Sequence, residues 1–265
     1  MIIDFHVHCF PDELAEKATS SLAERSGAHL WLNGTVGEIK ASMKNAGISS
    51  SVVLSIATRP QQSEKITQWS ASIQDEEIIA FGSIHPDLHD WLRELEKMKS
   101  MGIKGIKMHP DYQNFFVDEE RMFPIYEKVF EFGLIIVFHA GIDIGLPAPY
   151  HCTPERLKKV VRSFSGGKIV AAHMGGYGCW DDVEKHLVGE NLYMDTSFSI
   201  DKMDEMQFKR LIRNHGYDKL LFATDSPWSG QKEEVDRIKN LNLPQNIEDA
   251  IFGGNAIRIL EGLKW

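Results

Sequence analysis

Apolar runs bounded by turn residues recur along the whole chain. Several are nearly continuous, such as LIIVF at 134–138 and KIVAA at 168–172. Strands buried on both faces are typical of a parallel sheet covered by helices, whereas a sheet with one wet face alternates apolar and polar residues. The pattern predicts eight such strands, at 2–8, 51–56, 78–84, 105–109, 133–139, 168–173, 191–196 and 220–225.

Stretches with helical periodicity lie between these runs. Residues 87–101 carry Leu88, Trp91, Leu95 and Met98 at spacings of three and four, which predicts one buried helix face. Thr153 followed by Pro154 is typical of a helix start. The predicted helices are 12–25, 35–45, 87–101, 119–132, 153–164, 203–215, 233–241 and 247–260.

Eight strands that alternate with helices over about 250 residues predict a (β/α)8 TIM barrel. An open, doubly wound parallel sheet is the alternative. The sequence shows no internal repeat, low-complexity tract or long linker, so we expect one domain over residues 1–265.

Composition and charge exclude several classes of function. The chain has 29 Lys and Arg against 38 Asp and Glu, a net charge of −9, which argues against a nucleic-acid binder or a basic membrane-surface protein. No segment approaches the roughly 18 to 20 apolar residues of a membrane span. The N-terminus lacks the pattern of a secretory signal. Three cysteines without CxxC spacing predict a reducing compartment, hence the cytoplasm.

Histidine and aspartate side chains stand where predicted strands end. His6 and His8 are two residues apart in a strand, so their side chains share a face. His139, His173 and Asp225 close the fifth, sixth and eighth predicted strands. Because the carboxyl ends of barrel strands meet at one rim, we expect these side chains to converge. Three imidazoles with a carboxylate are ligands that suit Zn²⁺, Mn²⁺ or Fe²⁺.

The order of these motifs is similar to that of the amidohydrolase superfamily, in its amidohydrolase-2 branch of TIM-barrel metal-dependent hydrolases and decarboxylases. The resemblance is carried by IIDFHVHCFP, KGIKMHPDYQ, VFHAG, AAHMGG, ATDSPW and GGNAIRIL, from residue 2 to residue 260. It implies that His6, His8 and His139 bind a metal. Asp225 would bind the same metal and act as general base on its water. His173 would be an acid/base group or a ligand of a second metal.

Two further residues bear on this centre. Asp4 precedes His6 by two residues, and we expect its carboxylate to orient a ligand imidazole. Lys107, in GIKMHP, resembles the strand-four lysine of dihydroorotases, whose carboxylated form bridges two metals. Carboxylated Lys107 with His139 and His173 would make a second site; an ordinary amine is the alternative. We expect one ion, with Zn²⁺ ahead of Mn²⁺ and Fe²⁺.

Candidate substrate contacts follow the strand ends. Arg59 is the only arginine at the carboxyl end of a predicted strand and could bind a carboxylate. His109, Tyr112, Gln113 and Trp228 lie in or beside the loops after the fourth and eighth strands, where they would suit a planar or apolar ligand.

The leading prediction is a metal-dependent hydrolase of a small-molecule amide, ester or lactone, with Asp225 as the base for a metal-activated water. The alternative is a metal-dependent non-oxidative decarboxylase of a carboxylated ring or unsaturated acid. A second alternative is an inactive barrel that acts as a binding protein. The expected partner is a small molecule, with neither nucleic acid nor membrane, and the resemblance implies a homodimer.

Overall fold

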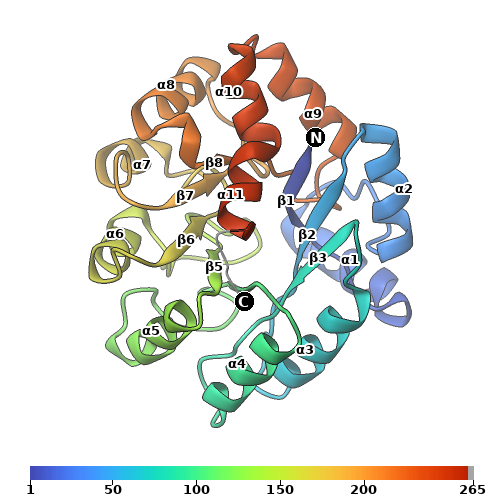
Figure 1. Cartoon of the computed structure of the whole chain (residues 1–265), viewed down its shortest axis with the longest axis vertical. Helices are drawn as coiled ribbons and strands as arrows, with labels where there is room; N and C mark the ends of the chain where they lie inside the picture. The colour runs from blue at the N-terminus through green and yellow to red at the C-terminus, as the bar shows by residue number, and fades with distance from the viewer. Residues whose placement is uncertain (262–265) are drawn as a thin grey trace.

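The computed structural model describes residues 1–261, and all eight predicted strands are present in it (Figure 1). Each ends one to four residues before its predicted carboxyl end, because the last residues leave the ladder and enter the loops that carry polar side chains. The strands are β1 (Ile3–Val7), β2 (Ser50–Leu54), β3 (Ile78–Phe81), β4 (Gly105–Met108), β5 (Ile135–Phe138), β6 (Lys168–Ala171), β7 (Tyr193–Asp195) and β8 (Leu220–Leu221).

The strands form a closed parallel ring. Ladders join β1 to β2 and β3, and join β4 through β8 in order. Single parallel bridges close the two remaining seams, Gly82 with Ile106 between β3 and β4, and Val7 with Ser226 between β1 and the residues after β8. The predicted (β/α)8 TIM barrel is therefore confirmed.

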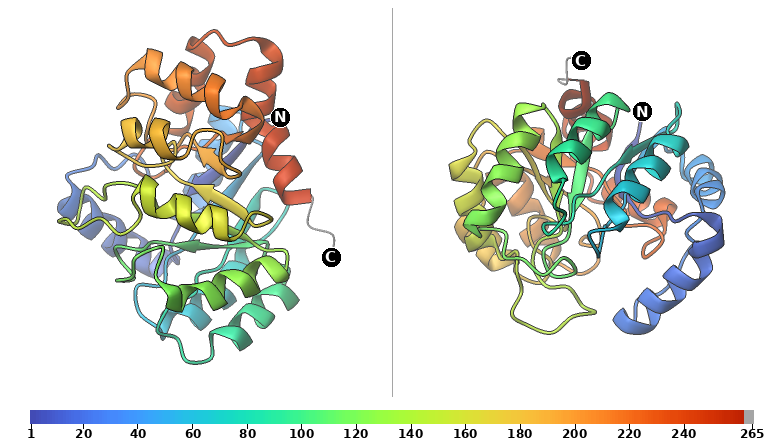
Figure 2. Two further views of the ribbon diagram at one scale, coloured as in Figure 1. Left: turned by 90° about the vertical axis from the view of Figure 1, so that its left-hand side faces the viewer. Right: turned by 90° about the horizontal axis from the view of Figure 1, so that it is seen from below.

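Helices surround the ring on its outer side (Figures 1 and 2). The predicted helices are confirmed, except that 247–260 divides into α10, a π-helical turn at Ala250–Gly254 and α11. Two helices were not predicted, α3 and α7, because their sequences lack a clear apolar period. The helices are α1 (Asp12–Ser26), α2 (Val36–Ala46), α3 (Gln62–Ile73), α4 (Trp91–Ser100), α5 (Phe123–Glu131), α6 (Pro154–Ser163), α7 (Trp180–His186), α8 (Glu205–His215), α9 (Gln231–Asn240), α10 (Gln245–Asp249) and α11 (Asn255–Glu261).

Two apolar clusters define the inside and the outside of the barrel. The interior cluster includes Phe5, Leu54 and Val137 and is closed at one end by Ile259 and Leu260 of α11. The outer cluster packs the other strand faces against the helices. The α1 helix and the loop between β5 and α6 project from the end opposite α11 (Figure 2). That end carries the polar side chains described next.

Strand β1 does not alternate regularly. Its pairing with β2 shifts register between Asp4 and Val7. Phe5 belongs to the interior cluster and Val7 to the outer one, although they are two residues apart. The irregularity turns His6 and His8 toward the barrel interior and leaves Asp4 on the opposite side of the strand.

None of the described helices is both long and apolar enough to cross a membrane.

Candidate metal centre

His6, His8 and Asp225 bring three donor atoms together at the carboxyl end of the barrel. The Nε2 atoms of His6 and His8 lie 3.2 Å apart, and Oδ1 of Asp225 lies 3.3 Å from the first and 3.2 Å from the second. Zinc–nitrogen bonds of about 2.0–2.1 Å would put neighbouring donors of a tetrahedral site about 3.3 Å apart. The spacing of this triad therefore fits a bound divalent ion.

The hydrogen bonds behind the triad fix which ring nitrogens carry protons. Nδ1 of His8 lies 2.7 Å from the carbonyl oxygen of Leu54, and Nδ1 of His6 lies 2.9 Å from Oδ2 of Asp195. Both partners are acceptors, so each Nδ1 carries the proton and each Nε2 presents a lone pair. Two lone pairs and a carboxylate oxygen thus face one another, an arrangement that a cation stabilises.

Charge and burial agree with this assignment. Burial and the nearby Lys107 ammonium hold the pKa of His6 well below its ordinary value, so its ring is neutral. Burial alone would raise the pKa of Asp225, but the imidazoles of His6, His8 and His173 outweigh it and lower that pKa to about 2. A neutral imidazole beside an ionised carboxylate is the form that binds metal.

The carboxylate that orients His6 is Asp195, not Asp4. Asp4 contacts only the backbone N–H of His6, at 3.3 Å, and accepts hydrogen bonds from Thr224 and Gln231 on the outer side of β1. The expectation for Asp4 assumed regular alternation, which the irregularity in β1 breaks. Asp195, at the end of β7, also accepts the backbone N–H of His173 at 3.0 Å and so links two site histidines.

Lys107 lies on the inner face of β4, fully buried. Its Nζ is 3.1 Å from Nε2 of His6, and burial lowers its pKa to about 8 despite the charges of Asp195 and Asp225. The Lys107 ammonium therefore lies next to a donor atom of the triad.

His139 and His173 lie beside the triad in a second arrangement. Nδ1 of His139 is 3.1 Å from Nε2 of His173, whose own Nδ1 is 3.1 Å from the carbonyl oxygen of Ser197. The predicted ligand His139 falls outside the triad; one of its ring nitrogens lies within 4.8 Å of donor atoms of His109 and Asp143. His109, predicted to touch substrate, is 3.0 Å from Asp143 through its Nε2.

Two of these residues occupy left-handed backbone conformations, His173 with φ of 59° and Asp225 with φ of 67°. Such conformations cost free energy in residues other than glycine and cluster at functional sites. Hydrogen bonds hold both: Asp225 N–H donates to the His6 carbonyl oxygen at 2.8 Å, and His173 N–H donates to Asp195. The strand ends are thus fixed before a ligand arrives.

The other predicted substrate residues lie in different surroundings. Tyr112 packs edge-on against His109, with ring centroids 4.3 Å apart. Gln113 accepts the His109 N–H and donates to two backbone carbonyls, so it ties strand ends together, and its substrate role stays a prediction. Trp228 is half-buried and follows Asp225 by three residues. Arg59 is exposed in the turn before α3.

Sequence reasoning missed three residues of this region. Asp195 ends a strand that had been predicted without a site residue, and Asp143 stands in a loop without a motif. Arg25, at the end of α1, places its guanidinium 6.0 Å from the ring centre of Tyr112 and lies beside Gly145 of the loop after β5. The only signal for Asp143 and Asp195 was an acidic residue at or shortly after a strand end.

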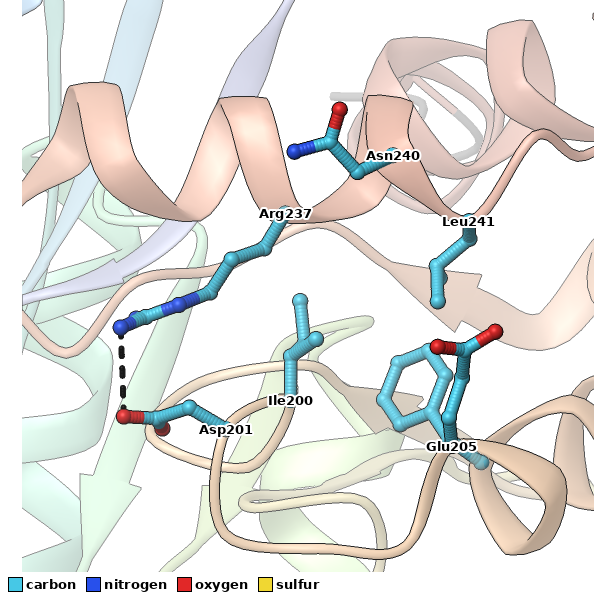
Figure 3. Close-up of a pocket in the computed structure, with 7 residues that line it drawn as sticks. Ile200, Asp201, Glu205, Arg237, Asn240 and Leu241 are labelled. Atoms are coloured by element: carbon cyan, nitrogen blue, oxygen red, sulfur yellow. Dashed lines mark ion pairs between the residues drawn. The ribbon is translucent and has the colours of Figure 1, made fainter.

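A separate cavity of about 220 Å³ lies outside the barrel, between α8, α9 and the loop after β7 (Figure 3). Arg237 crosses it to Asp201, with N and O 3.2 Å apart, and Ile200, Phe208 and Leu241 complete an apolar wall. None of the metal-centre residues lines it, so the cavity is not the candidate site.

Comparisons with known proteins bear on the family and the fold. Residues 3–262 match a family model described as amidohydrolase. No curated protein sequence matches the chain significantly.

Solved structures share the fold over nearly the whole chain. An uncharacterised TIM-barrel protein from Bordetella bronchiseptica has a TM-score of 0.80 at 18% identity, covering 99% of both chains. A dihydroxybenzoic acid decarboxylase from Polaromonas, with bound manganese and 2-nitroresorcinol, has a TM-score of 0.75 at 16% identity, covering 100% of this chain and 98% of that one. A 5-carboxyvanillate decarboxylase from Sphingomonas paucimobilis has a TM-score of 0.73 at 15% identity, covering 98% of both.

These comparisons correct the leading prediction from the sequence. The reactions named for the similar structures are decarboxylations of aromatic acids, including 2,6-dihydroxybenzoate. The hydrolase prediction was wrong because a metal and an acid/base carboxylate serve both reactions, so the ligand motifs alone do not separate them. A site able to hold a divalent metal is retained.

Proposed function

The chain belongs to the amidohydrolase family, and from this we propose that it is a metal-dependent, non-oxidative decarboxylase of a carboxylated aromatic ring. One observation carries the proposal: the lone pairs of His6 and His8 and the Asp225 carboxylate converge within 3.3 Å at the open end of the barrel. The named reactions of structures with this fold supply the reaction class.

His6, His8 and Asp225 would hold the ion, which we propose to be Zn²⁺ or Mn²⁺. When bound, the ion supplies positive charge. This charge attracts substrate oxygens to the barrel rim and withdraws electron density from the breaking carbon–carbon bond. The Leu54 carbonyl and Asp195 keep the two imidazoles in their binding tautomers. Both contacts use the Nδ1 atoms of the imidazoles, so the Nε2 atoms remain available to the ion.

The reaction replaces a carboxylate on the ring by a proton. A proton adds to the ring carbon, the bond from that carbon to the carboxylate breaks, and CO2 leaves as the ring regains aromaticity. Asp225 is ionised, so it first accepts a proton, from a substrate hydroxyl or from solvent, and then delivers it to the carbon. His173, fixed by Ser197 and Asp195, keeps its Nε2 edge toward the site and orients His139.

The loops at the rim supply the walls for a ring. Tyr112 and His109 form an aromatic side, and the Arg25 guanidinium lies next to the ring of Tyr112. We assign the recognition of the substrate carboxylate to Arg25, since its side chain reaches this wall, and Arg59 is the second candidate for that role.

The test is CO2 release from a panel of hydroxylated benzoates, with the protein stripped of metal by a chelator and reloaded with Zn²⁺ or Mn²⁺. The expected result is metal-dependent CO2 release and, in D2O, one deuterium on the ring carbon that lost the carboxylate. Asp225→Asn should reduce the rate by at least about 100-fold. Metal-dependent opening of amides or lactones without CO2 release from any acid would reject the proposal.

A further inference from the structure

Two polar side chains at the start of α9 are buried, and each keeps one oxygen without a hydrogen-bond partner. Gln231 and Glu234 are three residues apart in the helix, so they share the buried face of α9, with 1% and 0% of their surface exposed. Oε1 of Gln231 and Oε2 of Glu234 have no partner among the described residues. A buried acceptor without a partner is costly unless a ligand occupies it.

The bonded atoms of the two side chains show that both free oxygens are acceptors. Nε2 of Gln231 donates to Oδ2 of Asp4 on β1 at 2.8 Å and lies 3.4 Å from Oγ of Ser51 on β2. An ionised carboxylate only accepts, so the amide cannot turn its oxygen toward Asp4 instead. Oε1 of Glu234 accepts from Arg237, which leaves Oε2 as the free carboxylate oxygen.

The charges around these oxygens do not balance. Arg237 contacts Glu234 and also reaches Asp201, with Nη2 and Oδ2 3.2 Å apart (Figure 3). Lys202 pairs with Asp201 from the surface. Two cations thus serve three carboxylates, those of Asp4, Asp201 and Glu234, and one negative charge remains. Burial raises the pKa of Glu234 to about 7 although Arg237 opposes it, because the charges of Asp201 and Asp4 add to the effect.

From this arrangement we propose that one monovalent metal cation, Na⁺ or K⁺, binds where α9 meets β1 and β2, held by Oε1 of Gln231 and Oε2 of Glu234. The free atoms are oxygens, and the nearest further donor is the Ser51 hydroxyl, a set that suits hard cations. One uncompensated negative charge and one free carboxylate oxygen match a single positive charge. Ca²⁺ takes six to eight oxygens and Mg²⁺ keeps several waters, which this buried contact does not supply.

The ion has a route to this contact that does not pass through the metal centre. Arg237 lines the cavity of about 220 Å³ between α8 and α9, and its guanidinium contacts Glu234. The Arg237 side chain is 33% exposed, so it can move aside without disturbing the core. The monovalent ion is a second ion, distinct from the first, divalent ion that the triad would hold, and the inference does not depend on the reaction at the triad.

The test measures thermal unfolding of the Mn²⁺-loaded full chain at pH 8 in NaCl, KCl or choline chloride, each at about 0.2 M. Equal ionic strength keeps charge screening the same, so a difference between the salts reports specific binding. We expect the melting temperature in NaCl or KCl to lie about 3 °C above that in choline chloride. The salt with the larger shift identifies the preferred ion.

Variants of α9 locate the binding. Glu234→Gln should remove the difference between the salts, whereas exposed Glu233→Gln is the matched control and should keep it. In choline chloride Glu234→Gln should melt above the unaltered protein, and NaCl or KCl should narrow that gap. Asp225→Asn should also keep the difference between the salts, so a failure of the proposed function leaves this test intact.

Sodium nuclear magnetic resonance on the unaltered protein keeps the proposal testable if Glu234→Gln does not fold. We expect a broadened sodium line that KCl narrows by competition and choline chloride does not. Equal melting temperatures in the three salts, without such broadening, would overturn the proposal and leave water or a shared proton at the two oxygens. A salt difference that Glu234→Gln retains, or that Asp225→Asn abolishes, would equally overturn it, because the ion would then bind elsewhere.

Discussion

The Nζ atom of Lys107 lies 3.1 Å from Nε2 of His6, at the nitrogen that also faces His8 and Asp225. Because Nδ1 of His6 donates to Asp195, its Nε2 can only accept, and the lysine ammonium is the donor that reaches it. A divalent ion bound by the triad would compete with this ammonium for the same lone pair. The contact therefore couples the charge state of Lys107 to metal binding.

Replacing Lys107 by Met should tighten the binding of the first ion by about tenfold, because it removes a positive charge beside a ligand atom. Isothermal titration with Mn²⁺ measures the change, and the exposed Lys99→Met of α4 serves as the control. Weaker binding in Lys107→Met, together with tighter binding of the unaltered protein when bicarbonate is added, would show that the lysine acts in its carboxylated form.

Asp195→Asn should weaken metal binding by about 10- to 100-fold, because the amide no longer secures the proton on Nδ1 of His6. The matched control is Asp4→Asn, at the carboxylate that the sequence pattern assigned to this role. We expect that variant to change the metal affinity less than threefold while lowering the melting temperature, since Asp4 bonds Thr224 and Gln231. The opposite order of effects in the same titration would restore the sequence-based role of Asp4.

Sequence periodicity was sufficient for the barrel because its strands are buried on both faces and separated by turn residues. It also placed His6, His8 and Asp225 at one rim, since parallel strands end together. It failed for Asp4 because a register shift within β1 is a property of strand pairing that no spacing rule contains. The role predicted for His139 as a metal ligand stays a prediction; its proximity to His109 and Asp143 depends on loop conformation, which no spacing rule contains.

The choice between hydrolysis and decarboxylation lay beyond the sequence for a chemical reason. A metal ion with a nearby carboxylate can activate water or can stabilise a carboxylated substrate, and the same side chains serve both. In the proposed function the difference lies in the wall that would receive the substrate, and Arg25 reaches that wall from α1, far from any strand-end motif.

Glu234→Gln should stabilise the fold at pH 8 but not at pH 4. Burial raises the pKa of Glu234 to about 7 despite its ion pair with Arg237, and its Oε2 has no described partner. A raised pKa contributes stability below the unfolded value of 4.5, and that contribution is lost as the pH rises through about 7. The loss is at most about 3 kcal/mol. Urea unfolding at both pH values measures it, with exposed Glu233→Gln as control; equal shifts at the two pH values would contradict the assignment.

Arg25→Met should raise KM for a hydroxylated benzoate about tenfold and leave kcat within about twofold, because in the proposed function the guanidinium would bind the incoming carboxylate outside the reacting centre. Arg59→Met is the matched control, since Arg59 is exposed in the turn before α3 and we expect its loss to change KM less than twofold. Steady-state CO2 release with the metal-loaded enzyme provides both constants. A larger KM effect for Arg59→Met than for Arg25→Met would return carboxylate recognition to the arginine at the end of the second strand. Equal and small effects would mean that neither arginine binds the acid, and that the triad and its ion hold the carboxylate alone.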